Sequence, residues 1–547
     1  MSRHAARLAC VVVLASGGLA SALAVSSHAQ NALAGDTSSP ATTGPAVTNE
    51  AAEVLAISGH GWGHGLGLSQ WGAYGYALHG FSFSRILAHY YPGTTLGPAP
   101  AHAVRVLLTR ARRVTLESAV AWRAVDAAGK VFRLGPGPLV LTRAARVAGK
   151  PVTLPITLSA AAPIAVAGKP YRGRIAVSLD GKALQVVDIV GLESYLKGVV
   201  PSEMPFDWPV AALEAQAVAA RSYALANLVR GGAFDLYDDT RSQVYGGIDA
   251  EMSSTSAAVD ATKGQVVLFD GAVADTLFFS TSGGRTASAA ELLGKPIPYL
   301  VSVPDPYDTT SPFHDWGPVV FDVAAVAKKL KVAPTFSDVV VKAGPSGRVE
   351  TLTVLGADGS EASFTGTQVR AALDLRSTWF SPTLLSLTPA RTAITYGGAV
   401  TLTGFMRGTA AASLEAKPFG GDWAASGPVS VASDGTFHVI VSPRARTSYR
   451  LAAGVVRAGQ TLVSVAARVA ATIASAGAQG STSPAVSSSV VQLQRSDGTA
   501  WTTVSSTVTD AVGSFSFGGP LARGDYRIRC APGGGLQPGL SGVVTVP

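Results

Sequence analysis

The sequence is poor in cysteine and in charged residues. It contains 2 cysteines among 547 residues, and charged residues make up 14% of the chain, well below the usual quarter or so. Cys10 lies in an N-terminal apolar run that we expect to be removed, which leaves Cys530 alone and excludes an intramolecular disulfide framework. Hydrophobic residues make up 47% of the chain, so disorder as a description of the whole protein is also excluded.

Dense clusters of Lys and Arg are absent as well. The formal net charge is +8, and Arg3 and Arg7 of the N-terminal run account for two of these charges. The remaining excess suits a protein that acts on an anionic polymer of the cell envelope, and it equally suits simple solubility. Nucleic acid is therefore not an expected partner.

After residue 25 the chain lacks any uninterrupted apolar stretch of the eighteen or so residues that span a bilayer, so no transmembrane anchor is expected. The start of the chain has the pattern of a signal peptide, residues 1–29: two arginines, an apolar run over 8–25, and Ser27-His28-Ala29 as a cleavage site. Residues 30–52, rich in Ser, Thr, Ala, Pro and Gly, predict a flexible linker. We expect a secreted protein, extracellular or associated with the cell wall.

Composition and length favour several domains rich in turns. The chain has 60 glycines and 32 prolines, which disfavours a helical bundle, and its length suggests about three or four domains. Residues 53–380 mix strand-like segments with a few helical windows and predict one large α+β domain. After Ser381, short β-branched runs alternate with Gly, Ser, Asp and Pro and predict all-β modules.

A weak internal repeat divides this C-terminal part in two. Aromatic positions recur at offsets of 77 or 78 residues, and the pairs are Trp423 with Trp501, Phe437 with Phe515, and Tyr449-Arg450 with Tyr526-Arg527. Buried aromatics at matching strand positions are typical of sandwich folds. We expect two immunoglobulin-like β-sandwich modules, residues 381–468 and 469–547.

One helix of the α+β domain is well marked. Asp207 can cap it, Pro209 suits its first turn, and Gly231 can end it, which predicts a helix over residues 208–230. One face of this helix is rich in alanine, which predicts close packing against a neighbouring element.

Glu203 precedes this helix, and we expect it in a constrained loop between Pro201 and Pro205. Apolar neighbours such as Met204 and Trp208 disfavour a charged carboxylate, which raises its pKa and suits a proton donor near neutral pH. A glutamate before a helix is, however, more often a solvated residue or a partner of the helix dipole.

Several motifs give this segment a closer interpretation. They are YRGRIAVSLDGKALQVVDIVGLESYLKGVVPSEMP from Tyr171, WPVAALEAQAVAARSYAL from Trp208, SQVYGG from Ser242, AVDATKGQVVLFDG from Ala258, FFSTSGGRTAS from Phe278, and PYLVSVPD from Pro298. Over residues 54–380 the chain closely resembles the sporulation stage II protein D family, also called SpoIID/LytB or amidase-enhancer proteins. The resemblance implies a SpoIID/LytB-like α+β domain that acts on peptidoglycan.

In that family the glutamate of the SEMP motif is the catalytic acid of a lytic transglycosylase that acts on glycan strands without stem peptides. The resemblance assigns this role to Glu203. The implied reaction cleaves the β-1,4 bond between N-acetylmuramic acid (MurNAc) and N-acetylglucosamine (GlcNAc), and the muramic C6 hydroxyl closes an anhydro ring. Because the attacking hydroxyl belongs to the substrate, one carboxylate suffices and no cofactor is needed.

A second carboxylate would permit ordinary hydrolysis instead. The sequence contains four candidates, but it does not show whether any of them lies opposite Glu203. Each can equally be a helix cap or a solvated turn residue: Glu193, Asp207, Asp238 and Asp239.

Other family positions suggest contacts with the glycan. Arg221 and Tyr223 lie in the matching helix and could line a cleft, although Arg221 could equally pair with a carboxylate as internal scaffold. Ser282, Gly283 and Gly284 match a family loop, for which substrate contact and a simple tight turn remain equal alternatives.

The segment GHGWGHGLGL, residues 59–68, has glycine at every second position, so an extended chain places its larger side chains on one face. It belongs to GWGHGLGLSQWGA, and the family's similar segment usually lies near the end of the catalytic domain, so its position here resembles a circular permutation. From it we expect His64, Gln70 and Trp71 at the glycan, with a backbone contact as the alternative for His64. Ser69 is expected to cap a helix through Tyr76, and Ser82 one through His89.

No metal is expected. Glycine spacing argues against a helix that would place His60 and His64 on one face. Some family members hold zinc with Cys and His near the SQVY and STSGG motifs, where this chain has Ser242 and Ser282 and no cysteine.

Three functions follow from these observations. The first is an exported lytic transglycosylase with Glu203 as its single acid/base and peptidoglycan glycan strands as substrate. The second is a non-catalytic peptidoglycan-binding partner that enhances an N-acetylmuramoyl-L-alanine amidase. The third, a wall adhesin that uses the β-modules alone, leaves the Glu203 segment unexplained.

Overall fold

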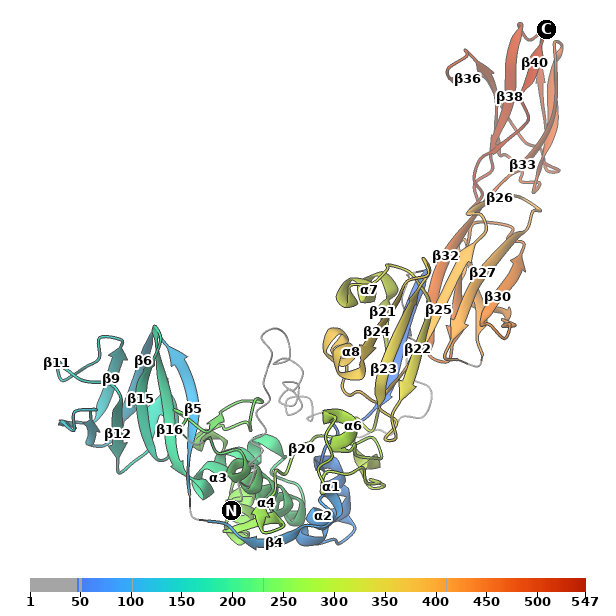
Figure 1. The fold of residues 1–547 in the computed structure, drawn as a ribbon. Helices are drawn as coiled ribbons and strands as arrows, with labels where there is room; N and C mark the ends of the chain where they lie inside the picture. Colours follow the sequence, from blue (N-terminus) through green and yellow to red (C-terminus); the bar gives the residue numbers. More distant parts are fainter. Residues whose placement is uncertain (1–46, 49–51, 101, 230, 410) are drawn as a thin grey trace.

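A computed structural model describes residues 47–48, 52–100, 102–229, 231–409 and 411–547. The predicted signal peptide and most of the predicted linker lie outside the described residues. Figure 1 shows an elongated molecule: a β-rich lobe on the left, a helical lobe below it, a sheet with two helices on the right, and two β-modules that continue to the C-terminus.

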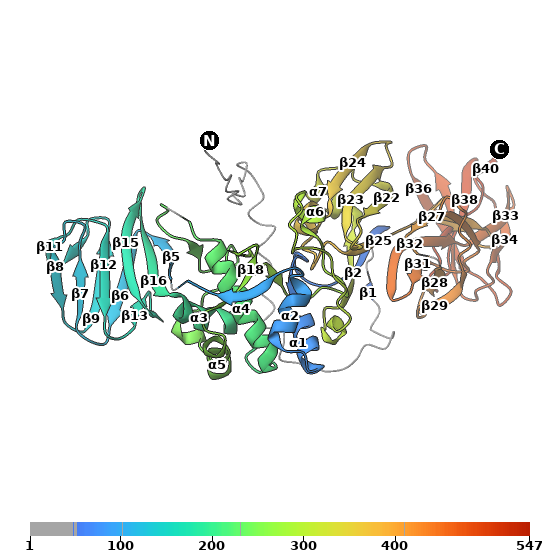
Figure 2. The ribbon, with the colours of Figure 1, turned by 60° about the horizontal axis from the view of Figure 1, so that its bottom comes forward.

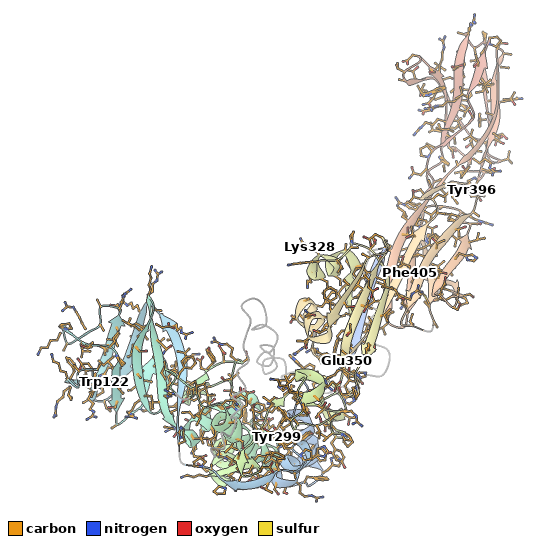
Figure 3. The ribbon with its side chains drawn as sticks, in the orientation of Figure 1. Trp122, Tyr299, Lys328, Glu350, Tyr396 and Phe405 are labelled. Atoms are coloured by element: carbon orange, nitrogen blue, oxygen red, sulfur yellow. The ribbon has the colours of Figure 1, made fainter. Side chains whose placement is uncertain are left out.

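The β-rich lobe, residues 103–191 with one short added strand, contains two sheets that face a common core. Its larger sheet has the order β17 (Leu236–Tyr237), β5 (Ala103–Ala111), β16 (Ala183–Gly191), β15 (Arg174–Asp180), β12 (Ile156–Ala160), β7 (Trp122–Val125), β8 (Val131–Leu134). The smaller has the order β14 (Lys169–Tyr171), β13 (Ile164–Val166), β6 (Arg113–Ser118), β9 (Gly137–Thr142), beside a hairpin of β10 (Arg146–Val147) and β11 (Lys150–Pro151). Side chains alternate along these strands, so apolar residues such as Val104, Val106 and Trp122 (Figure 3) point into the core.

The helical lobe is built around one central helix. Its helices are α1 (Gln70–Leu78), α2 (Phe83–Tyr90), α3 (Leu192–Glu203), α4 (Val210–Ala226), α5 (Ser253–Ala261) and α6 (Ala289–Leu293), and its short strands are β3 (Leu68–Ser69) with β20 (Phe278–Phe279), and β4 (Thr95–Pro98), β18 (Gln265–Phe269) and β19 (Ala272–Val273). Helix α4 packs against α1, α2, α3 and α5 (Figure 2). Its alanines at 212, 215, 217, 219, 220 and 224 are fully buried, which confirms the predicted close packing. Tyr299, labelled in Figure 3, packs on this lobe through Phe269.

Helix boundaries differ from the prediction around Glu203. Helix α4 begins at Val210 with Pro209 as its cap residue, rather than Asp207, because a residue before proline is held out of the helical region. It ends at Ala226, where the side-chain amide of Asn227 donates to the Tyr223 carbonyl. Glu203 does not lie in a loop: it is the last residue of α3, because Pro201 removes one N–H from the final turn without ending the helix.

The two predicted short helices are confirmed. The Ser69 hydroxyl accepts from the Gly72 amide and caps α1, which continues to Leu78. Ser82 precedes α2, which ends at Tyr90, but the Ser82 hydroxyl forms no capping hydrogen bond with this helix, so the predicted cap is wrong.

The third part of the molecule is a five-stranded sheet of order β21 (Asp315–Asp322), β2 (Glu53–His60), β25 (Phe380–Pro389), β27 (Val400–Arg407), β30 (Thr436–Val441). Leu55 and Ile57 of β2 face a core shared with the sheet β22 (Phe336–Ala343), β23 (Val349–Gly356), β24 (Glu361–Thr365) and with α7 (Val323–Leu330) and α8 (Gly366–Leu373). Val54 and Ala56, on the opposite face, enter the core of the first β-module.

This sheet corrects the predicted boundary at residues 380 and 381. Strand β25 begins at the boundary and forms antiparallel ladders with β2 on one side and β27 on the other. The backbone hydrogen bonds of one continuous sheet therefore join the first β-module to strand β2.

The second sheet of the first module has the order β1 (Val47–Thr48), β32 (Val456–Ala466), β31 (Thr447–Ala453), β28 (Ser413–Pro418), β29 (Ala424–Pro428), with β26 (Ala393–Thr395) beside β32. Strand β1 lies within the predicted flexible linker and pairs in parallel with β32. At least these two linker residues are therefore part of the fold.

The second β-module repeats this plan. Its sheets are β33 (Arg468–Ala474), β34 (Gly477–Ser483), β37 (Ser514–Gly518), and β36 (Trp501–Val508), β35 (Val490–Ser496), β38 (Gly524–Ala531), β39 (Gly539–Leu540), with β40 (Val544–Val546) beside β38. Figure 3 labels Tyr396 and Phe405 of the first module.

The repeat seen in the sequence is confirmed in space. Arg450 lies over the Trp423 ring at 4.0 Å, and Arg527 lies over the Trp501 ring at 4.2 Å. The partners of the two arginines across the ladder also correspond, Glu415 in the first module and Gln494 in the second. The matching phenylalanines and tyrosines are buried in the two module cores.

Candidate active site

The Glu203 side chain lies where three segments meet. Its own helix α3 ends there, the backbone amide of Val244 donates to Glu203 Oε1 at 2.9 Å, and the Gln70 side chain donates from Nε2 to the Glu203 carbonyl at 2.9 Å. Gln70 begins α1, so the SQWGA segment and the SEMP segment are neighbours in space although they are 133 residues apart in sequence.

Burial raises the pKa of the Glu203 carboxyl to about 7, and the hydrogen bond from the Val244 amide opposes this shift. The residue is nevertheless partly exposed to solvent. A carboxyl that is accessible and partly protonated near neutral pH can donate a proton to a bound molecule.

The SQVYGG loop, residues 242–247, holds the Val244 amide in place. Gln243 accepts from the Tyr195 hydroxyl and donates to the Ala220 carbonyl, and the Tyr245 hydroxyl donates to Asp188 at 3.0 Å. The Gly246 amide donates to the Gly198 carbonyl in α3. Gln243, Tyr245 and Gly246 therefore fix the loop on both sides of Val244.

Tyr223 shares the environment of Glu203. Burial, the charge of Asp275 and the charge of Glu203 together raise its pKa well above the ordinary value, and a side-chain hydrogen bond with Ser242 opposes the shift. Tyr223 is partly exposed, so contact with the glycan stays a prediction for this residue.

Arg221 does not reach this surface. It is fully buried and forms two hydrogen bonds with Glu193, of 3.0 and 2.7 Å, and two more with backbone carbonyls. Its role is the internal scaffold, the alternative already open from the sequence.

The glycine-alternating segment packs directly against the STSGG loop. Trp62 and Thr281 exchange backbone hydrogen bonds, and a side chain at Gly61 would lie 2.6 Å from the Thr281 carbonyl oxygen. The bare face therefore admits another backbone. His64 uses both ring nitrogens on backbone groups, the carbonyl of Phe278 and the amide of Leu66, which is the backbone alternative given above.

Ser282, Gly283 and Gly284 form a tight turn around a buried carboxylate. The Ser282 hydroxyl donates to Asp308 at 2.8 Å, and the amides of both glycines donate to the same oxygen. Ser282 and Gly283 are buried, so of the three predicted contact residues only Gly284 is partly exposed.

Trp71 belongs to a group of three aromatic residues. Its ring centroid lies 5.5 Å from that of Tyr74 and 4.8 Å from that of Trp208, and Tyr74 lies 4.8 Å from Trp208. All three are partly exposed. Tyr74 was not predicted here, because an aromatic residue three positions along a helix usually belongs to a core. Trp208 was noted only as an apolar neighbour of Glu203.

Comparison with known proteins gives this site a family. Residues 180–269, which include Glu203, α4 and the SQVYGG loop, match the family model SpoIID, "Stage II sporulation protein". This segment is a SpoIID domain.

Curated relatives agree with that assignment. The chain is 31% identical to the stage II sporulation protein D of Bacillus subtilis over 38% of its own length and 64% of that protein. It is 40% identical to the amidase enhancer of Bacillus subtilis, over 21% of its own length and 15% of that protein. It is 38% identical to an uncharacterized protein of Brachyspira hyodysenteriae, over 25% of its own length and 38% of that protein. The chain thus spans between 15% and 64% of the length of these relatives.

In the SpoIID domain the four candidate second carboxylates differ. Glu193 is bound to Arg221, Asp239 is bound to Arg241, and Asp207 is exposed. Burial and the charge of Asp239 raise the pKa of Asp238 to about 6. No charged group is among the causes of the Glu203 shift, so none of the four dominates its electrostatics.

Ser242 and Ser282, the serines near the two zinc-associated motifs, both form hydrogen bonds. Ser242 accepts from the Tyr237 amide, and Ser282 donates to Asp308. Among the described residues, no three His, Cys, Asp or Glu side chains gather in a way that could hold a metal ion. Over the same ranges, no helix is long and apolar enough to cross a membrane.

Proposed function

We propose that the protein is an exported peptidoglycan lytic transglycosylase that cleaves the MurNAc–GlcNAc β-1,4 bond of glycan strands lacking stem peptides, with Glu203 as its single acid/base. The supporting observation is the Glu203 carboxyl itself, partly exposed yet sufficiently desolvated for its pKa to lie at about 7. The signal peptide, the secreted location and the immunoglobulin-like nature of the two β-modules are parts of this proposal.

In the proposed reaction, protonated Glu203 donates its proton to the glycosidic oxygen as the bond to the muramic C1 breaks. The resulting carboxylate then takes the proton of the muramic C6 hydroxyl, whose oxygen bonds to C1 and closes the anhydro ring. Glu203 thus returns to its protonated form without consuming water. The Val244 amide holds Oε1, which leaves Oε2 to face the glycan and stabilises the carboxylate formed midway.

The ion pairs of two candidate carboxylates favour this single-carboxylate route over hydrolysis. An inverting or retaining hydrolase needs a second carboxylate at a set distance from the first. Glu193 forms an ion pair with Arg221, and Asp239 forms one with Arg241.

The test compares the purified protein with Glu203→Gln, after circular dichroism has established that both are folded. Each is incubated with glycan strands stripped of stem peptides, and the products are analysed by mass spectrometry. We expect fragments one water lighter than hydrolytic products from the unaltered protein, and none from the variant. Ordinary reducing ends would make the protein a hydrolase and contradict the proposed route.

A second function is favoured by one comparison, the 40% identity to an amidase enhancer. In this case the domain binds glycan without cleaving it and raises the activity of an N-acetylmuramoyl-L-alanine amidase. Stimulation of such an amidase to the same extent by the unaltered protein and by Glu203→Gln, with neither cutting glycan, supports this function over the first.

A further inference from the structure

The three aromatic residues next to the SEMP segment form a surface that the reaction itself does not use. Trp71 and Tyr74 come from α1, and Trp208 comes from the turn before α4. We propose that Trp71, Tyr74 and Trp208, here called the aromatic platform, stack against a pyranose ring of the glycan strand beside the cleaved bond. The inference rests on the proposed function for its substrate class.

The platform is fixed to Glu203 from two sides. Gln70 donates to the Glu203 carbonyl, and Trp71 follows it directly, with its own backbone amide bound to the Ser280 carbonyl. On the other side, Trp208 lies five residues after Glu203 and packs on the core that contains buried Met204. A ring bound on the platform is therefore held at a set position relative to the carboxyl.

The geometry of the rings suits a sugar better than a closed core. Neighbouring rings are tilted or edge-on to one another, at 48 to 71°, so none of the three pairs is stacked face to face. A pyranose ring presents C–H groups on one face and hydroxyls around its edge, so its apolar face can lie on an aromatic ring whose face carries partial negative charge. The hydroxyls remain free for water or polar side chains.

Apolar surface continues next to the platform. Phe206 is 52% exposed and Val210 is 63% exposed, and both lie within two residues of Trp208. Covering exposed aromatic and aliphatic side chains of this size with a ligand removes apolar surface from water, which favours binding. We assign the glycan strand to this surface because, when one glycosidic bond lies at Glu203, the next sugar of the same strand must lie close by.

The experiment measures the binding of a peptide-free MurNAc–GlcNAc hexasaccharide by calorimetry, in the Glu203→Gln background so that no cleavage occurs. Trp71→Leu and Trp208→Leu are compared with Trp71→Tyr, which keeps an aromatic face, and with Phe81→Leu. Phe81 is a matched control: a partly exposed aromatic residue of the same lobe, packed on Tyr76 and Arg85 instead. Thermal unfolding of every variant separates lost folding from lost binding.

We expect each leucine variant to raise Kd about tenfold or more, and Trp71→Tyr and Phe81→Leu to leave Kd within about twofold. If both leucine variants fold and bind as tightly as the background protein, the platform is overturned. If the background protein itself binds no glycan, the proposed function fails instead.

A second measurement needs no variant. Hydroxyl-radical footprinting of the Glu203→Gln protein, read by mass spectrometry, reports the accessibility of each aromatic side chain. We expect the hexasaccharide to reduce labelling of Trp71, Tyr74 and Trp208 and to leave Phe81 unchanged. Unchanged labelling of all three at saturating glycan overturns the platform even if the leucine variants do not fold.

Discussion

The proposed reaction depends on how the Glu203 carboxyl is solvated. Glu203 receives a single amide hydrogen bond, and burial raises its pKa from an ordinary value near 4.5 to about 7. In the proposed reaction the protonated form is the active one, and it predominates below that pKa. We therefore predict that the rate of glycan cleavage falls as pH rises through about 7, by up to about tenfold per pH unit above it.

The measurement is the initial rate of anhydro-product formation between pH 5 and 9. Thermal unfolding at each pH serves as the control, because a loss of folded protein would mimic the same fall. A rate that declines near pH 4.5, or that stays constant to pH 9, contradicts the assignment of Glu203 as the proton donor.

Single residues also mark the limit of what the sequence could predict. Glu203 was identified through its motif and its apolar neighbours. Arg221 and His64 belong to equally well-matched motifs, yet Arg221 is held by Glu193, and backbone groups occupy both ring nitrogens of His64. A motif gives residue types and spacing, whereas burial and partners depend on segments far away in sequence.

At the scale of elements, the site depends on the contact between α3 and the SQVYGG loop. A Cβ atom at Gly198 would lie 2.7 Å from the Tyr245 ring and 2.9 Å from the Gly247 carbonyl oxygen. We predict that Gly198→Ala displaces this loop and with it the Val244 amide. Cleavage should fall about tenfold or more, and the free energy of unfolding should drop by about 1–3 kcal/mol, as is usual for overpacking.

Gly191→Ala is the matched control. It lies at the other end of the same helix, and a Cβ atom there would meet nothing within 4 Å. Kinetic assay and thermal unfolding of both variants provide the comparison. Full activity in Gly198→Ala would mean that the loop does not position the Glu203 carboxyl.

Element boundaries show why local signals were insufficient. Pro201 and Pro205 suggested a loop around Glu203, but α3 continues through Pro201 because a proline in a last turn loses only one bond. Pro209 was expected inside the next helix and instead precedes it. The close packing of the alanine face of α4 was predicted correctly, because a packed helix face has a periodic pattern of small residues in the sequence. A shift of a helix end by about one turn does not change that pattern.

At the scale of the whole molecule, the first β-module and the α+β part share one sheet. The composition change at residue 381 marks where helical periodicity stops, but strand pairing crosses that point because Val54 and Ala56 of β2 complete the module's core. Such pairing between distant strands leaves no local signal, so the sequence separated parts that the fold joins.

Two truncations test this arrangement. We predict that a chain ending at residue 380 aggregates, because it loses β25 and exposes the core side chains of β2. A chain ending at residue 467 should remain folded and monodisperse, since the second β-module has a core of its own. Size-exclusion chromatography and circular dichroism distinguish the two, and a well-folded monomer ending at 380 would contradict the shared sheet.

The pairing of β2 with β25 also sets an order of events during biosynthesis. The two strands are more than 300 residues apart, and ribosomes deliver the chain from its N-terminus. Strand β2 is therefore synthesised more than 300 residues before β25 and stays without this neighbour until β25 has been made. Final folding of this sheet must therefore be a late step, with the slow kinetics typical of high contact order.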